Sequence, residues 1–377
     1  MKFKIISECK HTGARTGKIY TDHGVLETPF FMPVGTYGSV KTQTSEEIKD
    51  LPSKILLSNT YHLFLRPSMD IMTKAKGLHN FMNWDGAILT DSGGYQIYSL
   101  EGHRTIDSDG VTFKSHYDGS MHRFTPEKII DIQRIIGSDL MMVLDVCPSG
   151  KLNLKDWKEA VQLTTNWAYR SYEQYNKTET KYGHKQSIIP IIQGGTNKEL
   201  RIQSAKELLD LDLENYAIGG LAVGEPKEAM LKTTEWMNDI IPREKSKYLM
   251  GVGTPVDLIE CIRRGVDMFD CVIPTRNARN SQLFTHKGKI NIKNAQYKDD
   301  HSIIDTNSTS VLSQKYTKAY LHHLFRMNEI LGLRISTAHN LHFYINLMKT
   351  VKLKIEDGTF NSWSAKFIDI YNKGRND

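Results

Sequence analysis

Short apolar runs separated by helical segments make up most of the chain. The runs predict eight strands, at 30–34, 55–57, 87–90, 140–144, 188–192, 216–218, 247–249 and 267–269. Helices are predicted between them, for example at 44–51 and 154–176. Another begins at Thr125-Pro126-Glu127, which supplies an N-cap, a first-turn proline and a first-turn acid. Eight strands alternating with helices predict an α/β fold, a (β/α)8 TIM barrel.

Other segments depart from this alternation. Residues 1–25 predict a small β cap with two strands, and residues 111–124 predict a polar hairpin that turns at Asp118-Gly119. Residues 278–345 read as a subdomain inserted in the last βα unit. We expect one catalytic domain over 1–377, with most of the barrel at 26–277 and C-terminal helices at 346–377. Helical periodicity in the last part of the chain falls at 315–332, 340–352 and 360–373.

The composition narrows the class of protein. Hydrophobic residues are 39% and charged residues 24% of 377, which excludes a disordered chain. No apolar run approaches the roughly 20 residues needed to span a bilayer, and the first residues lack a signal-peptide pattern, so we expect no membrane partner. The four cysteines form no CxxC pair, which excludes a disulfide scaffold and favours a reducing compartment, the cytoplasm. The net charge of +6 permits a nucleic-acid partner.

Polar or glycine residues end nearly every predicted strand. They are Asn59, Asp91, Asp145, Gln193, Gly220, Gly251 and Asp270. In (β/α)8 barrels the active site lies at the carboxyl ends of the strands. This register therefore predicts a site that gathers three aspartates and a glutamine.

Three carboxylates are candidates for chemistry. Reactions at a sugar C1′ use two of them, one as nucleophile and one as general acid or base. Asp270 lies between apolar residues, where an unpaired acid is costly, and this favours a functional role. Asp91, in LTDSGGYQ, and Asp145 are equally compatible with capping of a turn or helix.

Two groups of residues suggest the ligand. Gln193 and Gly220, together with Asp145, offer donors and acceptors for the edge of a purine-like base. Tyr95 and Met250 would sandwich its faces, although ordinary core packing also explains both.

A basic segment follows Asp270. Arg276 and Arg279 lie just behind it, and residues 271–298 contain no acid. A solvated basic loop remains an alternative, but a nucleic-acid backbone fits the acid-free stretch better.

The chain resembles the bacterial-type tRNA-guanine transglycosylases, the queuine tRNA-ribosyltransferase family. The motifs that carry the resemblance are SNTYHLFLRP, LTDSGGYQI, QGG, AIGGLAVGE, YLMGVGTP and DMFDCVIPTRNAR, and the match spans essentially the whole chain. The resemblance implies exchange of guanine 34 in tRNAs with GUN anticodons for a 7-deazaguanine base, in queuosine biosynthesis. It also implies a homodimer.

The resemblance assigns roles to individual residues. Asp270 matches the nucleophile, which forms a covalent intermediate with tRNA, and Asp91 matches the general acid/base. The residues that match substrate-binding positions are Asp91, Ser92, Gly93, Gly94, Tyr95, Asp145, Gln193, Gly220, Leu221 and Met250, with Glu225 near Leu221. The residues that match RNA-contacting positions are Gly251, Val252, Gly253, Thr254, Pro255, Val256, Asp257, Thr275, Arg276, Asn277, Ala278 and Arg279.

Positions near the base pocket bear on which base is inserted. Val223 and Cys147 match the bacterial pattern, which implies 7-aminomethyl-7-deazaguanine, and queuine is the alternative. Val146 stands where the family usually has glutamate, and this changes the polarity of the neighbourhood.

The family's structural zinc has lost its cysteine ligands in this chain. The family pattern is CxCxxC followed by a histidine, and here Ser308, Ser310, Ser313 and His339 occupy these positions. Because a serine hydroxyl stays protonated at neutral pH, it is a poor zinc ligand. We expect no metal and no other cofactor, and a subdomain held by packing and hydrogen bonds. The alternative is a site rebuilt from His301 and Asp305, and the homodimer could be weakened.

Three functions are alternatives to a transglycosylase. A metal-dependent barrel hydrolase usually has an HxH pair after the first strand, whereas this strand ends in Pro33-Val34-Gly35. A non-catalytic tRNA-binding subunit would be expected to lose Asp270 or Asp91, and both are present. A DNA-modifying relative that inserts deazaguanine bases is the third.

Overall fold

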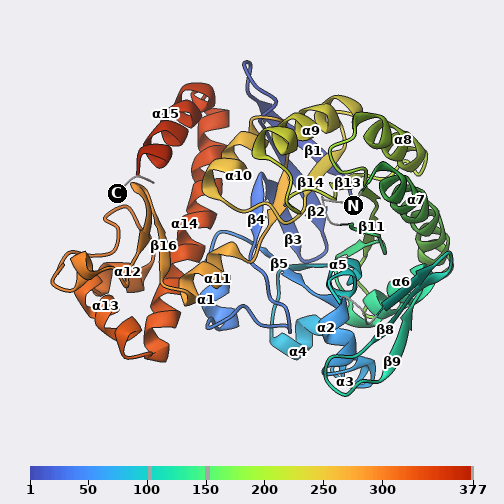
Figure 1. Cartoon of the computed structure of the whole chain (residues 1–377), viewed down its shortest axis with the longest axis horizontal. Helices are drawn as coiled ribbons and strands as arrows, with labels where there is room; N and C mark the ends of the chain where they lie inside the picture. The colour runs from blue at the N-terminus through green and yellow to red at the C-terminus, as the bar shows by residue number, and fades with distance from the viewer. Residues whose placement is uncertain (101–103, 149–152, 375–377) are drawn as a thin grey trace.

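Two parallel sheets form the centre of the larger body of the molecule (Figure 1). The computed structural model describes residues 1–100, 104–148 and 153–374. One sheet has the order β11-β10-β6-β5, and the other has the order β12-β13-β14-β15-β4. Their strands are β4 (Phe30–Met32), β5 (Ile55–Ser58), β6 (Ala87–Thr90), β10 (Leu140–Met142), β11 (Ser187–Ile189), β12 (Ile191–Ile192), β13 (Asn215–Ile218), β14 (Ser246–Leu249) and β15 (Met268–Asp270). All eight predicted strand positions are thus occupied by strands.

Hydrogen bonds join the two sheets at both of their edges. The predicted strand 188–192 is divided at Pro190, which has no N–H to give to a ladder, and the Pro190 carbonyl accepts from Ala217 N at 2.9 Å. At the other edge, Leu57 N donates to Pro33 O at 3.0 Å and Gly35 N donates to Leu57 O at 2.7 Å. The strands of the two sheets are therefore in backbone contact where β11 meets β12 and where β4 meets β5.

Helices follow the strands and cover the sheets from outside (Figure 1). The long ones are α6 (Pro126–Ile136), α7 (Leu154–Lys177), α8 (Lys198–Leu209), α9 (Lys227–Ile240) and α10 (Pro255–Ile262). The short ones are α1 (Ser45–Lys49), α2 (Thr60–Leu65), α3 (Met69–Lys74), α4 (Leu78–Met82) and α5 (Gly94–Tyr98). Helix α6 begins as predicted, because the Thr125 side chain accepts from Lys128 N at 3.2 Å. Among the described residues, no helix is both long and apolar enough to cross a membrane.

Two antiparallel sheets lie outside the parallel ones. The N-terminal sheet has three strands, β1 (Phe3–Glu8), β2 (Arg15–Thr21) and β3 (Gly24–Thr28), where two were predicted. The predicted hairpin is present as β8 (Gly110–Lys114) and β9 (Met121–Phe124), and β7 (Arg104–Asp107) joins it.

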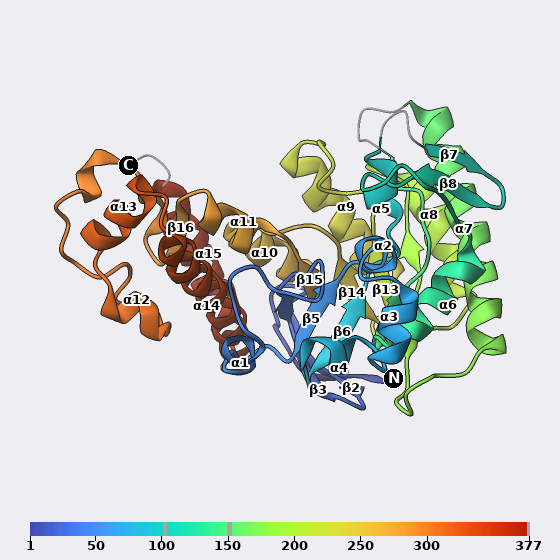
Figure 2. The same ribbon diagram turned by 90° about the horizontal axis from the view of Figure 1, so that it is seen from below.

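The C-terminal part forms a lobe beside the sheets (Figure 2), and its last two helices also pack against the main apolar core. It has its own apolar cluster, which includes Leu283, Leu321 and Phe325. The two helices predicted at 315–332 and 340–352 are present as α13 (Lys318–Arg326) and α14, but the boundary between them was wrong, because α14 already begins at Ile330 and runs unbroken to Glu356. Residues 335–341 are all buried, including polar ones, so no amphipathic period marks this stretch as helical. The lobe's elements are α11 (Ile273–Arg279), β16 (Gln282–Thr285), β17 (Gly288–Asn291), η1 (Ala295–Tyr297), α12 (Val311–Lys315), α13 (Lys318–Arg326), α14 (Ile330–Glu356) and α15 (Phe360–Lys373).

Candidate active site

The predicted site residues lie at the carboxyl ends of successive parallel strands. Asp91 follows β6, Asp145 lies beyond β10, and Gln193 follows β12. Gly220 follows β13 by two residues, and Asp270 is the last residue of β15. Because the strands are parallel and neighbouring, these residues lie along one edge of the two sheets.

Asp91 is buried and held by four hydrogen-bond donors. Its Oδ1 accepts from the backbone N–H groups of Thr60 at 2.9 Å and Gly93 at 3.2 Å. Its Oδ2 accepts from the side-chain amides of Asn59 and, at 3.0 Å, Gln96. Burial raises the pKa of Asp91 to about 7, the hydrogen bonds from Asn59 and Thr60 oppose that rise, and the nearby Asp270 adds to it. This carboxyl group is thus poised to exchange a proton near neutral pH.

Asp270 has a different environment. Its Oδ1 accepts from Tyr248 OH at 2.7 Å and from Gly251 N at 3.0 Å. Burial raises the pKa of Asp270, while these two donors favour its ionised form. No hydrogen bond within the described residues engages Oδ2, so this oxygen is available to a substrate atom. One oxygen is oriented and the other is free, as a carboxylate nucleophile requires.

Asp145 forms a polar cluster with Ser92 and Gln193. Ser92 Oγ donates to Asp145 Oδ1 at 3.1 Å, and Gln193 Nε2 donates to Oδ2 at 2.9 Å. Burial raises the pKa of Asp145 to about 6, and the two hydrogen bonds oppose that rise. The Gln193 Oε1 atom is buried without a partner. The cluster therefore pairs most of its own polar groups and leaves one acceptor, Gln193 Oε1, unpaired.

Two glycines make the close approach in this cluster possible. A Cβ at Gly220, whose φ is +64°, would lie 2.3 Å from Gln193 Oε1, and one at Gly94 would lie 2.6 Å from the Asp145 carbonyl. Neither position admits a side chain without displacing the groups that line the pocket. The last glycine of the SGG motif (92–94) and that of the IGG motif (218–220) are thus explained by close packing around these polar groups.

A buried arginine organises the loops beneath the cluster, and sequence reasoning missed it. The Arg201 guanidinium donates to the carbonyls of Gly195 (2.8 Å), Ile192 (2.8 Å) and Gly219 (2.7 Å), which all lie at strand ends. Burial lowers the pKa of Arg201 to about 9. Because Arg201 lies within a polar helical segment, it looks like a solvated residue, and no local signal marks it.

Three more contact residues were missed. Tyr248 lies inside an apolar run and looks like core, and Gln96 lies within a short helix. Asn59 was predicted only as a residue at a strand end. Its position directly after β5 was the one sequence feature that could have placed it in the site. The contacts of Asn59 with Asp91 and of Tyr248 with Asp270 join neighbouring strands, which local sequence does not reveal, whereas Gln96 lies only five residues beyond Asp91.

The other predicted pocket residues differ in exposure. The Tyr95 side chain is 58% exposed, so it is available to stack, whereas Leu221 is buried. Met250 packs against the main apolar core. Glu225 accepts from the backbone N–H groups of Ala222 and Val223, and it thereby holds the loop after Leu221 in place.

The environment of the two cysteines near the site disfavours their thiolate forms. Burial raises the pKa of Cys147 and of Cys271 to about 12, and each lies near an aspartate that adds to the effect. Val146 is buried in the main apolar core, and its backbone N–H donates to Thr164 Oγ1 at 3.0 Å.

The predicted RNA-contacting residues are only partly exposed. In the 251–257 segment Gly251 is exposed, Thr254 and Asp257 are half-buried, and the other four are buried. Thr254 caps α10, and the carbonyl of Gly253 accepts from Tyr344 OH at 2.5 Å. Much of this segment therefore serves packing and capping.

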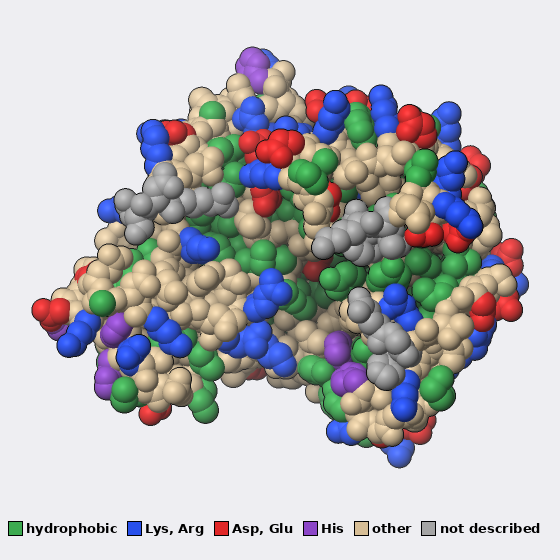
Figure 3. Space-filling model, in the orientation of Figure 1, with side chains coloured by type: hydrophobic (Ala, Val, Ile, Leu, Met, Phe, Trp, Pro, Cys, Tyr) green, Lys and Arg blue, Asp and Glu red, His purple; other side chains and the backbone are tan. Residues whose placement is uncertain are grey.

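The 275–279 segment forms most of α11 and carries two exposed arginine side chains. Arg276 and Arg279 are exposed, Asn277 is half-buried, and Thr275 and Ala278 are buried. Figure 3 shows Lys and Arg side chains between the C-terminal lobe and the larger body, beside a hollow that hydrophobic side chains line. This face is suited to a polyanion.

The serines at the expected zinc positions are tied into a hydrogen-bond network. Ser313 Oγ donates to His339 Nδ1 at 2.9 Å, and His339 Nε2–H donates to Phe284 O at 2.8 Å. Ser310 Oγ accepts from Ser313 N at 3.4 Å, and Ser308 Oγ accepts from Ser310 N at 3.2 Å. Burial lowers the pKa of His339 to about 4, which keeps it neutral. Three hydroxyls and a histidine whose two nitrogens are both engaged do not fit a structural zinc.

The two residues considered as alternative zinc ligands, Asp305 and His301, are also engaged with other partners. Asp305 Oδ2 accepts from His286 Nδ1 at 2.7 Å, and His301 is an exposed residue that pairs with Asp299. No interaction between His301 and Asp305 joins them within the described residues.

Comparison with known proteins identifies the family. The family described as "Queuine tRNA-ribosyltransferase" matches residues 9–373. The chain is 47% identical over 371 residues to the queuine tRNA-ribosyltransferase of Bacillus subtilis (strain 168), which covers 98% of this chain and 96% of that protein. It is 49% identical over 369 residues to the protein of the same name from Ruminiclostridium cellulolyticum, with 98% of each covered. It is 47% identical over 374 residues to the one from Desulforamulus reducens, with 99% of this chain and all of that protein covered. The chain belongs to the queuine tRNA-ribosyltransferase family.

Proposed function

We propose that the protein is a tRNA-guanine transglycosylase of queuosine biosynthesis, a pentosyltransferase that exchanges guanine 34 of GUN-anticodon tRNAs for a 7-deazaguanine base. The observation that carries this proposal is the pair of buried carboxylates, Asp91 and Asp270, which lack cationic partners in the described residues and have raised pKa values. Family membership supports the same activity.

In the first half of the reaction, Asp270 Oδ2 attacks C1′ of the ribose. A C1′–O bond forms, and the C1′–N9 bond to guanine breaks. The electron pair of that bond stays on the guanine, which takes a proton from Asp91. Because the pKa of Asp91 is near 7, a substantial fraction of it carries that proton at neutral pH. Tyr248 and Gly251 orient Asp270 through its other oxygen.

In the second half, Asp91 accepts the N9 proton of the incoming base. The base nitrogen then attacks C1′, and the bond to Asp270 breaks with its electron pair on the carboxylate. Two displacements give net retention at C1′. Since all four acceptor positions of Asp91 are occupied, one donor must withdraw, and the Gln96 side-chain amide is the one we assign to this movement.

The Asp145 cluster reads the base. Asp145 accepts from the base's N–H groups, while Gln193 and the Gly220 backbone engage its carbonyl oxygen, and Tyr95 and Met250 contact its faces. Binding replaces the internal bonds of Asp145 with bonds to the base. We assign the incoming base as 7-aminomethyl-7-deazaguanine, with its amine received by the Leu221 carbonyl and Glu225. The alternative is queuine.

The proposal extends to the closure of the barrel, the domain boundaries, the oligomeric state and the absence of zinc from the C-terminal lobe. The two parallel sheets form one closed (β/α)8 barrel, which the hydrogen bonds at both sheet edges support. The division at 26–277, 278–345 and 346–377 places its last boundary inside α14. The functional protein is a cytoplasmic homodimer that binds tRNA through 251–257 and 275–279. The lobe holds no zinc, and the Ser313–His339 hydrogen bond replaces it.

The test is base exchange into a GUN-anticodon tRNA. Radiolabelled guanine exchange is measured first, and then kinetics with guanine, 7-aminomethyl-7-deazaguanine and queuine are compared on one tRNA. Exchange that is lost in Asp270→Asn supports the proposal. Tight tRNA binding without exchange in the wild type would instead favour a non-catalytic tRNA-binding subunit.

A further inference from the structure

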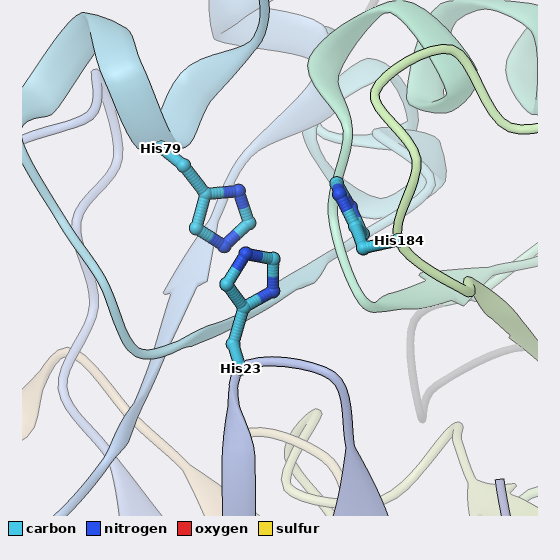
Figure 4. Close-up of side chains that lie close together, drawn as sticks. All are labelled: His23, His79 and His184. Carbon is cyan, nitrogen blue, oxygen red and sulfur yellow. The ribbon is translucent and has the colours of Figure 1, made fainter.

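Three histidines from distant parts of the chain meet at the end of the sheets opposite the carboxylates (Figure 4). His23 lies in the turn between β2 and β3, His79 lies in α4, and His184 precedes β11. One ring nitrogen of each lies within 4.8 Å of the others. Their surroundings contain a buried carboxylate, Asp139, which directly precedes β10.

Each histidine has one nitrogen engaged by an oxygen acceptor. His23 Nδ1 is 2.7 Å from Asp139 Oδ1, and His184 Nε2 is 2.9 Å from Gly137 O. His79 Nε2 is 3.1 Å from Gly86 O and 3.4 Å from Asp139 Oδ2. An N–H that donates to such an oxygen places the lone pair of a neutral imidazole on its other nitrogen. Metal-binding histidines in proteins are held by this same arrangement of carboxylates and carbonyls.

The second nitrogen of each ring has no hydrogen-bond partner among the described residues. These atoms are Nε2 of His23, Nδ1 of His79 and Nδ1 of His184. Three clustered imidazoles that each have one unpaired ring nitrogen suit a shared metal cation.

We propose that His23, His79 and His184 bind one divalent late first-row transition-metal ion, with Zn²⁺ as the reference ion. Imidazole suits this class of metal, and a fourth ligand position stays open to water. Asp139 acts as the outer partner that orients His23. The ion links the N-terminal sheet, α4 and the segment before β11, so its role is to stabilise the fold at the end remote from catalysis.

The rings must adjust to bind the ion. The His23 and His79 rings stack with centroids 3.9 Å apart and planes at 15°, so their in-plane lone pairs do not face one point. Tetrahedral zinc with bonds of about 2.0 Å places its ligand nitrogens about 3.3 Å apart, which requires one ring to turn. The side chains are 22% and 12% exposed, so they retain a path to solvent and room for this rotation.

The test is metal binding to the full-length protein after chelation and dialysis. Titration calorimetry with ZnCl2 should give one ion per chain, and Co²⁺ should give the visible absorption of a tetrahedral site. In His184→Gln the amide still donates to Gly137 O, yet a ligand is lost, so the affinity should fall at least about tenfold. The rise in thermal unfolding temperature with added zinc should disappear in the same variant.

The matched control is His301→Gln, which removes an exposed histidine that also pairs with a carboxylate. It should bind zinc as the wild type does, and guanine exchange by metal-free His184→Gln should match that of the metal-free wild type. Equal zinc affinity in His184→Gln and wild type would overturn the proposal, as would a wild type that binds no zinc. Loss of binding in His339→Gln alone would place the ion in the C-terminal lobe and would likewise refute it.

Discussion

Buried aspartates lie at both ends of the parallel strands, and the groups that donate hydrogen bonds to them differ between the two ends. At the amino ends, Asp267 accepts from Arg15 Nε at 2.9 Å and from Nη2 at 2.6 Å, and Asp139 accepts from His23 and from Ile88 N. At the carboxyl ends, Asp91 and Asp270 accept only from neutral donors within the described residues.

This contrast distinguishes the acids that bind other elements of the fold from the two that we propose to react. The hydrogen bonds from His23 and His79 lower the pKa of Asp139 against the opposing effect of its burial. Without an arginine or histidine partner, burial raises the pKa of Asp91 to about 7 and raises that of Asp270. A carboxylate whose ionised form is stabilised by an arginine or histidine holds the fold together, whereas one without such a partner is free to exchange a proton or attack carbon.

The strongest test of this contrast is Asp270→Asn. The amide is a poor nucleophile, so we expect guanine exchange to fall by about 10³-fold or more while the fold is kept. Exchange kinetics and trapping of the covalent tRNA complex on a denaturing gel measure the effect. Residual exchange above a tenth of the wild-type rate would remove Asp270 from its role.

The matched variant at the opposite end is Asp267→Asn. It leaves the buried Arg15 guanidinium without its anion, so we expect a loss of about 3–5 kcal/mol in the free energy of unfolding. Denaturant unfolding measures this loss, and exchange per folded molecule should stay unchanged. A large fall in exchange with normal stability would break the distinction between the two ends.

The pH dependence of exchange tests Asp91. In the second half of the reaction the incoming base must lose its proton to ionised Asp91, so the rate of this half should fall by about tenfold per pH unit well below the pKa of about 7. Asn59→Ala removes a hydrogen bond that lowers this pKa, so the acid limb of the profile should move to higher pH. An unchanged limb would mean that another group controls it.

The same pKa has a consequence for stability. Asp91 titrates at about 7 in the folded state and near its ordinary value of 3.8 when unfolded, so the folded state binds more protons between these values. The difference in unfolding free energy between wild type and Asp91→Asn should therefore fall as pH rises from about 4 to 7. A difference that is flat over this range would contradict the raised pKa.

The smallest expected effect is in the C-terminal lobe. Ser313→Ala leaves the buried His339 Nδ1 without its donor, so we expect a loss of about 1–3 kcal/mol in unfolding free energy. Ser308→Ala, at a less buried position, is the control and should lose less. If the two variants are equally stable, the Ser313–His339 bond does not support the lobe.

The success of the sequence predictions depended on how local their signals were. Strands were located because buried parallel strands are short apolar runs, and the strand-end register located Asp91, Asp145 and Asp270. The 333–339 part of α14 was missed because tertiary packing buries polar residues there, such as His339, which bonds to the Phe284 carbonyl. Propensity and period do not record such contacts.

The sequence by itself determined the family, the alternation of strands and helices, and the identity of the acids at the strand ends. Only the tertiary structure decided which buried acids have an arginine or histidine partner, because Arg15 and Asp267 are 252 residues apart and His23 and Asp139 are 116 apart. It likewise brought His23, His79 and His184 together. The physical reason is that the pKa of a buried side chain depends on burial and on neighbours in space, which the order of residues along the chain does not specify.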